Sequence, residues 1–149
     1  MLKLADVKNT DIVYDLGCGD GRIVIAAAKT YGARGVGIDI DPVRIREEKA
    51  NAKKAAVENL VRFEENDLFQ ADFHEASVVT LFLLPAVNLK LRPKLLQNLK
   101  PGTRIVSNTF DMDDWKPEKE FTVGDSDTEY EPLSKRLYLW TVPARASGK

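Results

Sequence analysis

Three glycines in a short stretch, VYDLGCGDGRIVIAAA at residues 13–28, give the clearest indication of a bound ligand. Gly17, Gly19 and Gly21 stand between an apolar run and an alanine-rich run. They predict a tight strand-to-helix turn whose bare backbone lets a ligand approach closely. A dinucleotide fingerprint would place its third glycine where Arg22 stands, and the G-K-[ST] ending of a phosphate-binding loop is absent. Neither standard phosphate motif therefore fits this turn.

The acids around the turn indicate the charge of the ligand. Asp15, directly before the glycines, would repel a pyrophosphate and favours a ligand with positive charge. Asp39, 24 residues further on, could accept both hydroxyls of a ribose, and Asp67 could accept the amino group of adenine. Together they predict S-adenosylmethionine, which carries an ammonium and a sulfonium. The plainer alternatives are a simple connection for the glycines, a loop cap for Asp39 and a solvated acid for Asp67.

Alternating strand and helix patterns position these residues. The expected strands are residues 12–16, 35–39, 61–64, 77–84, 104–110, 120–123 and 136–142. The expected helices are residues 22–31, a helix from Pro42 to about Asn59 with Ile45, Ala52 and Ala56 inside, and a helix that begins at Pro93 with Leu95, Leu96 and Leu99 inside. This order predicts an α/β, doubly wound Rossmann-like fold whose mostly parallel sheet ends in a C-terminal antiparallel edge hairpin.

Length and composition bound the remaining properties. The 149 residues suit a single domain, 1–149, and the net charge of −1 gives no reason to expect nucleic acid as a partner. Residues 111–131 carry nine acids and two lysines, a net charge of −7 that suits attraction of lysine-rich partners. The single cysteine, Cys18, and the lack of a membrane segment or signal pattern favour a cytoplasmic protein. We expect no metal site, and a monomer or weak oligomer.

Three stretches resemble one branch of the class I S-adenosylmethionine-dependent methyltransferases: VYDLGCGDGRIVIAAAK, VVTLFLLPAVNLKLRPKLLQNLKPGTRIVSNTF and DMDDWKP. The branch is that of the archaeal broad-specificity protein lysine methyltransferases, related to the mitochondrial enzymes that act on the ATP synthase c-subunit and the nucleotide carrier. The resemblance implies the seven-stranded Rossmann-like methyltransferase fold and an N-terminal lid segment that is short or missing here. It implies cofactor contacts at Asp15, Gly17, Gly19, Asp39, Asn66, Asp67 and Leu68.

The resemblance also implies the reaction, which is transfer of a methyl group from S-adenosyl-L-methionine to the ε-amine of exposed lysines in protein substrates. A methyltransferase for a small molecule or an RNA nucleoside, and a cofactor-binding domain with little activity, remain alternatives. No residue stands out as a general base, since His74, the only histidine, is expected at the surface. Trp115 could pack on the stem of the substrate lysine. Pro85, Asn88 and Phe110 are expected near the same side.

Overall fold

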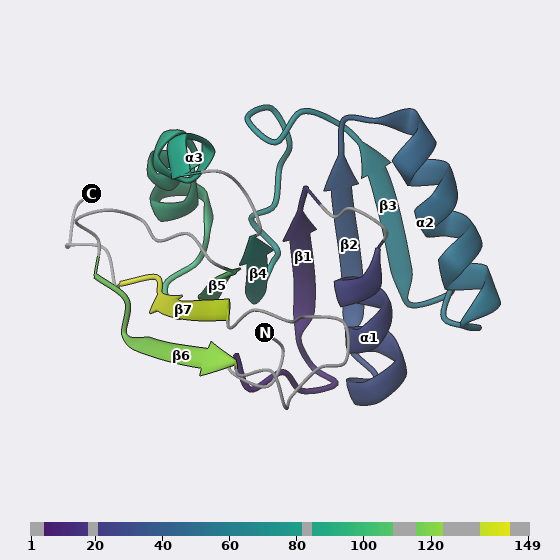
Figure 1. Ribbon diagram of the computed structural model, residues 1–149, viewed down its shortest axis with the longest axis horizontal. Helices are drawn as coiled ribbons and strands as arrows, with labels where there is room; N and C mark the ends of the chain where they lie inside the picture. The colour runs from purple at the N-terminus through teal and green to yellow at the C-terminus, as the bar shows by residue number, and fades with distance from the viewer. Residues whose placement is uncertain (1–4, 18–20, 82–84, 109–115, 124–134, 144–149) are drawn as a thin grey trace.

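The computed structural model describes residues 5–17, 21–81, 85–108, 116–123 and 135–143. These residues form seven strands and three helices, which Figure 1 shows as one sheet with helices packed against it. In chain order the elements are β1 (Ile12–Leu16), α1 (Arg22–Tyr31), β2 (Arg34–Asp39), α2 (Pro42–Lys54), β3 (Val61–Glu65), β4 (Val78–Leu81), α3 (Pro85–Asn98), β5 (Arg104–Asn108), β6 (Lys119–Val123) and β7 (Lys135–Thr141).

The strands lie in the order β3-β2-β1-β4-β5-β7-β6. β1 to β5 are parallel, whereas β7 runs antiparallel to both of its neighbours, β5 and β6. This arrangement confirms the predicted fold, including the antiparallel C-terminal edge. The order of the strands reverses between β1 and β4, and ligands of such sheets bind at the carboxyl ends of the strands next to this reversal.

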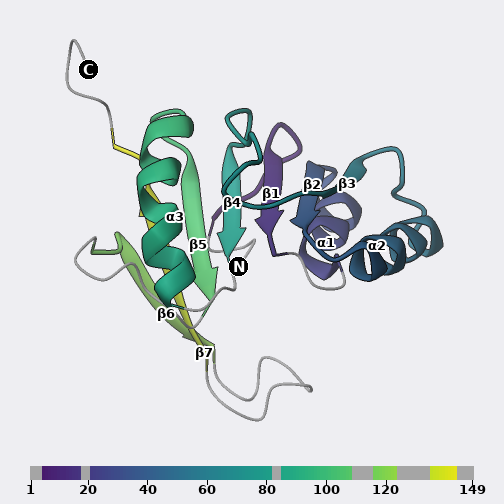
Figure 2. The same ribbon diagram turned by 90° about the horizontal axis from the view of Figure 1, so that it is seen from above.

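Two apolar cores cover the two faces of the sheet. On one face, α1 and α2 bury Val24, Ala27, Ile45 and Ala52 against the strands. On the other face, α3 contributes Leu91, Leu95 and Leu99, together with Phe73 from the segment that connects β3 to β4. Figure 2 shows α3 and the α1–α2 pair on opposite sides of the sheet. The parallel strands are therefore buried on both faces, which explains their nearly continuous apolar sequences.

The end of α2 differs from the prediction. The helix stops at Lys54 and not near Asn59, and Ala56, expected on the inner stripe, lies outside the helix with a φ of 60°. The Val57 N–H donates to the Ala52 oxygen and the Ala56 N–H to the Lys53 oxygen, at 3.1 and 3.0 Å. These two bonds form a Schellman motif, in which Ala56 occupies the left-handed position that glycine usually takes. The turn directs Val57 into the core, where it is only 6% exposed.

The prediction that a helix begins at Pro93 is also wrong. α3 begins at Pro85, and Pro93 lies inside it. Leu91, Leu95 and Leu99 are all fully buried at intervals of four residues, so an unbroken helix places one apolar stripe against the sheet. That burial outweighs the backbone hydrogen bond that a proline inside a helix removes. Leu96, also expected in the core, is only partly buried.

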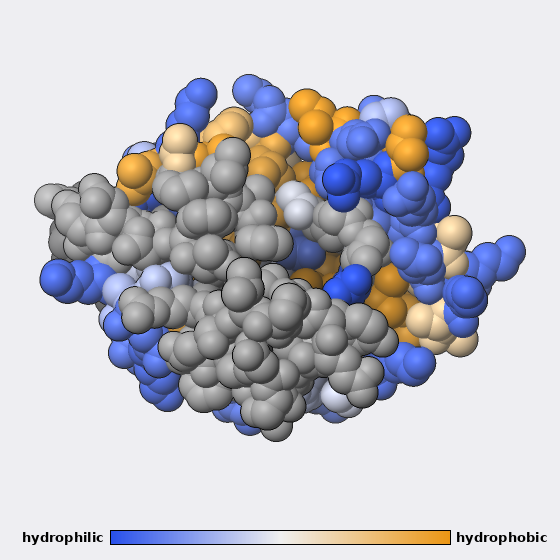
Figure 3. Space-filling model, viewed as in Figure 1, coloured by the Kyte–Doolittle hydropathy of each residue, from blue (hydrophilic) through white to orange (hydrophobic). Residues whose placement is uncertain are grey.

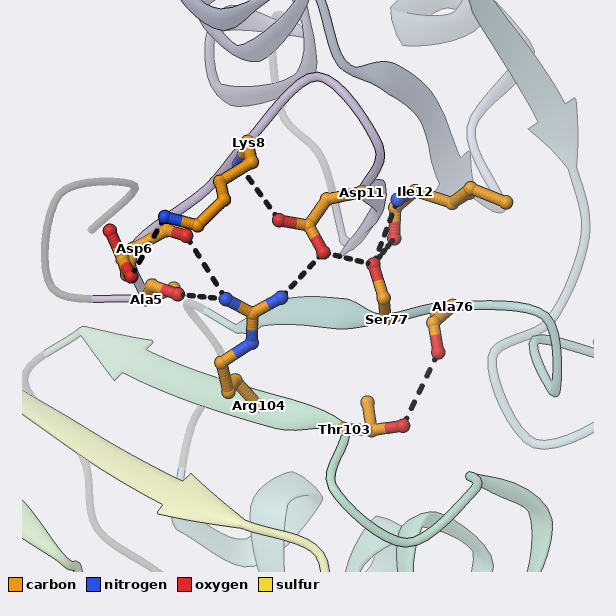
Figure 4. A network of polar contacts seen from close by, with 9 residues as sticks. All are labelled: Ala5, Asp6, Lys8, Asp11, Ile12, Ala76, Ser77, Thr103 and Arg104. Atoms are coloured by element: carbon orange, nitrogen blue, oxygen red, sulfur yellow. Dashed lines mark hydrogen bonds and ion pairs between the residues drawn. The ribbon is translucent and has the colours of Figure 1, made fainter.

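A polar network joins the amino ends of the strands (Figure 4). Arg104, the first residue of β5, donates to the backbone oxygens of Ala5 and Asp6 and forms an ion pair with Asp11. The Ser77 hydroxyl donates to Asp11 at 2.7 Å and accepts from the Ile12 N–H at 2.8 Å. The network fixes the start of β1, β4 and β5, on the edge of the sheet opposite to the carboxyl ends.

Candidate cofactor-binding site

The glycine turn lies between the carboxyl end of β1 and the start of α1. Gly17 has a φ of 71°, and its N–H donates to the Ile38 oxygen at 2.9 Å, which ties the turn to β2. Gly21, the N-cap of α1, has a φ of 80°. A Cβ at Gly21 would lie 3.1 Å from Phe63 Cε1 and 3.2 Å from Glu48 Cβ and Cγ. Both glycines therefore meet a backbone requirement, and Gly21 also meets a steric one; Gly19 lies outside the described residues.

Asp15 lies at the centre of the sheet and is only 5% exposed. Thr80, directly opposite it on β4, donates its hydroxyl hydrogen to Asp15 Oδ1 at 2.7 Å. A carboxylate buried to this degree is costly unless it is hydrogen-bonded, so Thr80 fixes its position below the glycine turn. Sequence reasoning missed Thr80, although a hydroxyl residue inside the apolar run VVTLFLL was an available signal.

Asp39 and the Asn66-Asp67 pair lie next to each other, at the ends of β2 and β3. The Asn66 N–H donates to the Asp39 oxygen at 2.9 Å. Asp39 Oδ1 accepts from the Asp41 N–H at 3.0 Å, and Asp67 Oδ1 accepts from the Phe69 N–H at 2.9 Å. One oxygen of each carboxylate therefore caps its own turn, as the plainer interpretation expected, and these bonds also hold both acids at the edge where the glycine turn lies.

An apolar rim surrounds these acids. Among the described residues, four large apolar side chains are exposed, and each closely follows the carboxyl end of a parallel strand: Ile40 at 68%, Val43 at 48%, Phe69 at 36% and Leu89 at 41%. In Figure 3, hydrophobic surface is visible along the upper rim, among hydrophilic residues. Exposed apolar side chains gathered in this way mark a binding surface. No sequence pattern indicated the rim, because Ile40 and Val43 stand in polar surroundings.

The other predicted residues divide into three groups. Leu68 is partly buried against the core beside α3. Asn88, expected near the substrate, is instead fully buried and donates to Ser107 Oγ at 3.4 Å, so it links α3 to β5. Trp115 and Phe110 lie outside the described residues, as do most of the acidic segment and the side chain of Pro85.

His74 is at the surface, as predicted. It contacts Asp72 with 2.7 Å between Nδ1 and Oδ1, and it lies before the amino end of β4, away from the carboxyl edge. In the described part of the chain, no three His, Cys, Asp or Glu side chains are grouped to hold a metal ion. None of the described helices is long and apolar enough to cross a membrane.

The doubly wound sheet, the glycine turn and the acids at successive strand ends define a class I methyltransferase. A family model described as the ANTKMT methyltransferase domain matches residues 15–119. The chain belongs to this family, and the predicted class of enzyme, an S-adenosylmethionine-dependent methyltransferase, is thereby confirmed.

Three relatives illustrate the relationship. A protein-lysine N-methyltransferase from Saccharolobus islandicus (strain REY15A) is 44% identical over 95% of this chain and 86% of its own length. A lysine N-methyltransferase of the ATP synthase c-subunit from Xenopus laevis is 35% identical over 77% of this chain, which spans only 50% of that protein. The crystal structure of an RNA methyltransferase from Salinibacter ruber, in complex with S-adenosyl-L-homocysteine, has a TM-score of 0.87 at 53% identity, over 99% of this chain and 91% of that one.

Proposed function

We propose that this protein transfers a methyl group from S-adenosylmethionine to the ε-amine of lysine residues in other proteins. The observation that carries the proposal is the similarity to the archaeal protein-lysine N-methyltransferase, which extends over 95% of this chain. The mitochondrial relatives, whose names also specify lysine, support it.

The residues at the carboxyl edge fit such a cofactor. The two positive-φ glycines leave room beside a buried carboxylate, Asp15, which suits the ammonium of the methionine end. Asp39 would bind the ribose, and Asn66 with Asp67 would bind the adenine, with Gly19 and Leu68 as further contacts. The exposed Ile40 next to Asp39 offers an apolar surface for a flat ring. When bound, S-adenosylmethionine supplies an electrophilic methyl group on a positively charged sulfur.

The protein mainly has to orient the lysine and exclude water. A lysine with a pKa of about 10.4 must lose a proton before it can attack, at a cost of roughly 4 to 5 kcal/mol at pH 7. Transfer of the ammonium from water to an apolar rim lowers this cost, because desolvation disfavours the charged form. The exposed Leu89 and Phe69 provide such a rim, and Trp115 remains our candidate for the contact with the lysine stem. No side chain is assigned as a general base.

An RNA nucleoside is the second candidate acceptor, because the Salinibacter ruber relative is called an RNA methyltransferase. We favour protein for this chain because its net charge of −1 offers little attraction to a polyanion. The net charge of −7 across residues 111–131 is suited instead to lysine-rich substrates. We further propose one methyltransferase domain over residues 1–149, a cytoplasmic location and a monomer or weak oligomer.

Labelled cofactor distinguishes the two acceptors. The purified protein is incubated with methyl-labelled S-adenosylmethionine and, separately, with lysate protein and total RNA. Label recovered at lysine after protein hydrolysis is the expected result. Label in RNA alone would overturn the proposal, and binding of the cofactor without transfer would favour the inactive-domain alternative.

Substitution of Asp39 tests the placement of the cofactor. Loss of a charged hydrogen bond in Asp39→Ala should weaken the binding of S-adenosylhomocysteine by about 1.5 to 3 kcal/mol in a calorimetric titration. Asp41→Ala is the matched control: Asp41 caps α2 through the Val43 N–H, so this variant should lose about 1 kcal/mol of stability but no affinity. Equal affinity of Asp39→Ala and the wild type would show that the ribose lies elsewhere.

A further inference from the structure

Two lysines of α3 contact the segment that carries Asn66 and Asp67. Lys90 Nζ lies 5.2 Å from the centroid of the Phe69 ring, and Lys94 Nζ lies 4.9 Å from that of the Phe73 ring. Both partners are four residues apart, so consecutive turns of the helix meet consecutive aromatic rings of the segment. Phe73 is fully buried, whereas Phe69 is 36% exposed. The inner of the two contacts is therefore the better shielded from water.

Lys94 makes a further contact that reaches the backbone beside the acids. Its ammonium donates a hydrogen bond to the Leu68 oxygen at 3.2 Å, directly after Asp67. Burial lowers the pKa of Lys94, although Asp72 and Asp67 act in the opposite direction. The ammonium is thus partly desolvated, a condition in which hydrogen bonds and contacts with aromatic rings become stronger.

The segment needs such support because of its own structure. Residues 66–77, between β3 and β4, contain neither a helix nor a strand. Asp67 is held mainly by local turns, since its backbone oxygen accepts from the Gln70 and Ala71 N–H groups at 2.9 Å. The contact with Lys94 joins this segment to α3, 26 residues further along the chain.

We propose that Lys94 is a positioning residue for the adenine end of the cofactor. By holding the Leu68 carbonyl, Lys94 fixes the backbone that presents Asn66 and Asp67 next to Asp39. The inference rests on the adenosine placement proposed above. It predicts an effect on cofactor affinity and not on the methyl transfer itself, because the contacts of Lys94 are with Leu68 and Phe73 of the protein.

Binding of S-adenosylhomocysteine tests the inference without any methyl acceptor. Lys94→Met keeps an apolar stem but removes the charge and the donor, and should raise the Kd about three- to tenfold. Lys94→Arg keeps a cation and a donor, and should stay within about twofold of the wild type. Lys100→Met, at an exposed position after the same helix, is the matched control and should leave the Kd unchanged. With any acceptor that is turned over, kcat of Lys94→Met at saturating cofactor should stay within about twofold of the wild-type value, since the contacts of Lys94 do not change between ground state and transition state.

A lower melting temperature of Lys94→Met with an unchanged Kd would overturn the inference, because Lys94 would then be merely structural. An arginine variant as weak as the methionine variant would also overturn it. If Lys94→Met does not fold, Lys90→Met decides: a Kd raised about twofold supports the inference, and an unchanged Kd contradicts it. Failure of the cofactor placement is distinguishable, since Asp39→Ala would then retain full affinity.

Discussion

Replacement of Gly21 by alanine should show how much the glycine turn depends on the absence of a side chain. The φ of 80° is unfavourable for any residue with a Cβ, at a cost of about 1 to 2 kcal/mol. The new Cβ would also lie 3.1 Å from Phe63 Cε1 and 3.2 Å from two carbons of Glu48. Both neighbours are buried and cannot move freely, so crowding should add about 1 to 3 kcal/mol. Gly21→Ala should therefore lose about 2 to 5 kcal/mol of stability.

Gly102 provides the matched control. Its φ is 90°, but a Cβ there would meet no atom within 4 Å, so Gly102→Ala should lose only the conformational cost of about 1 to 2 kcal/mol. Both substitutions restrict the unfolded chain to the same extent, so this contribution cancels in the comparison. The difference between the two variants measures the crowding of the turn against Phe63 and Glu48.

Urea unfolding of both variants and the wild type measures these free energies, with similar slopes indicating a common unfolding transition. Gly21→Ala should also bind S-adenosylhomocysteine more weakly, whereas Gly102→Ala, after α3 and away from the carboxyl edge, should bind it normally. Two variants destabilised equally, within about 0.5 kcal/mol, would refute the argument that close packing at Gly21 forces the choice of glycine.

Three further substitutions test other parts of the fold. Burial, followed by the charge of Glu75, raises the pKa of Tyr14 from 10.0 to about 12; the folded state therefore keeps a proton that the unfolded chain releases, and the stability this contributes is full below pH 10 and lost as the pH rises through 12. The melting temperature should then differ between Tyr14→Phe and the wild type in its dependence on pH between 10 and 12, and parallel curves would contradict this. Ala56→Gly should raise the free energy of unfolding by about 1 kcal/mol in urea, because glycine adopts the left-handed position without strain; a loss of stability would contradict the Schellman motif. Arg104→Met should lose about 2 to 3 kcal/mol through its broken bonds to Asp11 and the N-terminal backbone while the Kd for S-adenosylhomocysteine stays the same, and a weaker Kd would show that the two edges of the sheet are coupled.

The sequence predicted most of the fold because local signals marked most of the elements. β1 and α1 have the predicted bounds, since Gly17 ends the apolar run and Gly32 ends the alanine-rich helix in a left-handed conformation. The end of α2 was not predictable in this way, because Ala56 takes the place of the usual glycine. The start of α3 was misplaced because Pro93 resembles a first helical residue, whereas the buried leucine stripe decides where the helix runs.

The candidate site was predictable only as far as the order of the strands was. Acids after successive parallel strands must meet at one edge, so the neighbouring positions of Asp39 and Asn66 follow from the pattern of elements. The contact between Thr80 and Asp15 joins residues 65 positions apart and depends on the pairing of β4 with β1. No local pattern specifies that pairing, and the same holds for the contact of Lys94 with the Leu68 carbonyl.

The two edges of the sheet satisfy their charges in different ways, and this contrast argues for a ligand at the carboxyl edge. At the amino edge, Arg104 and Asp11 neutralise each other. At the carboxyl edge, the carboxylates of Asp39 and Asp67 accept hydrogen bonds from backbone N–H groups of their own turns, and the exposed large apolar side chains of the described chain gather around them. Acids held by backbone donors beside an apolar rim are suited to a partner that brings both hydroxyl or amino donors and a flat apolar ring. An adenosine group has these properties, and a second protein surface would have to supply them from several separate residues.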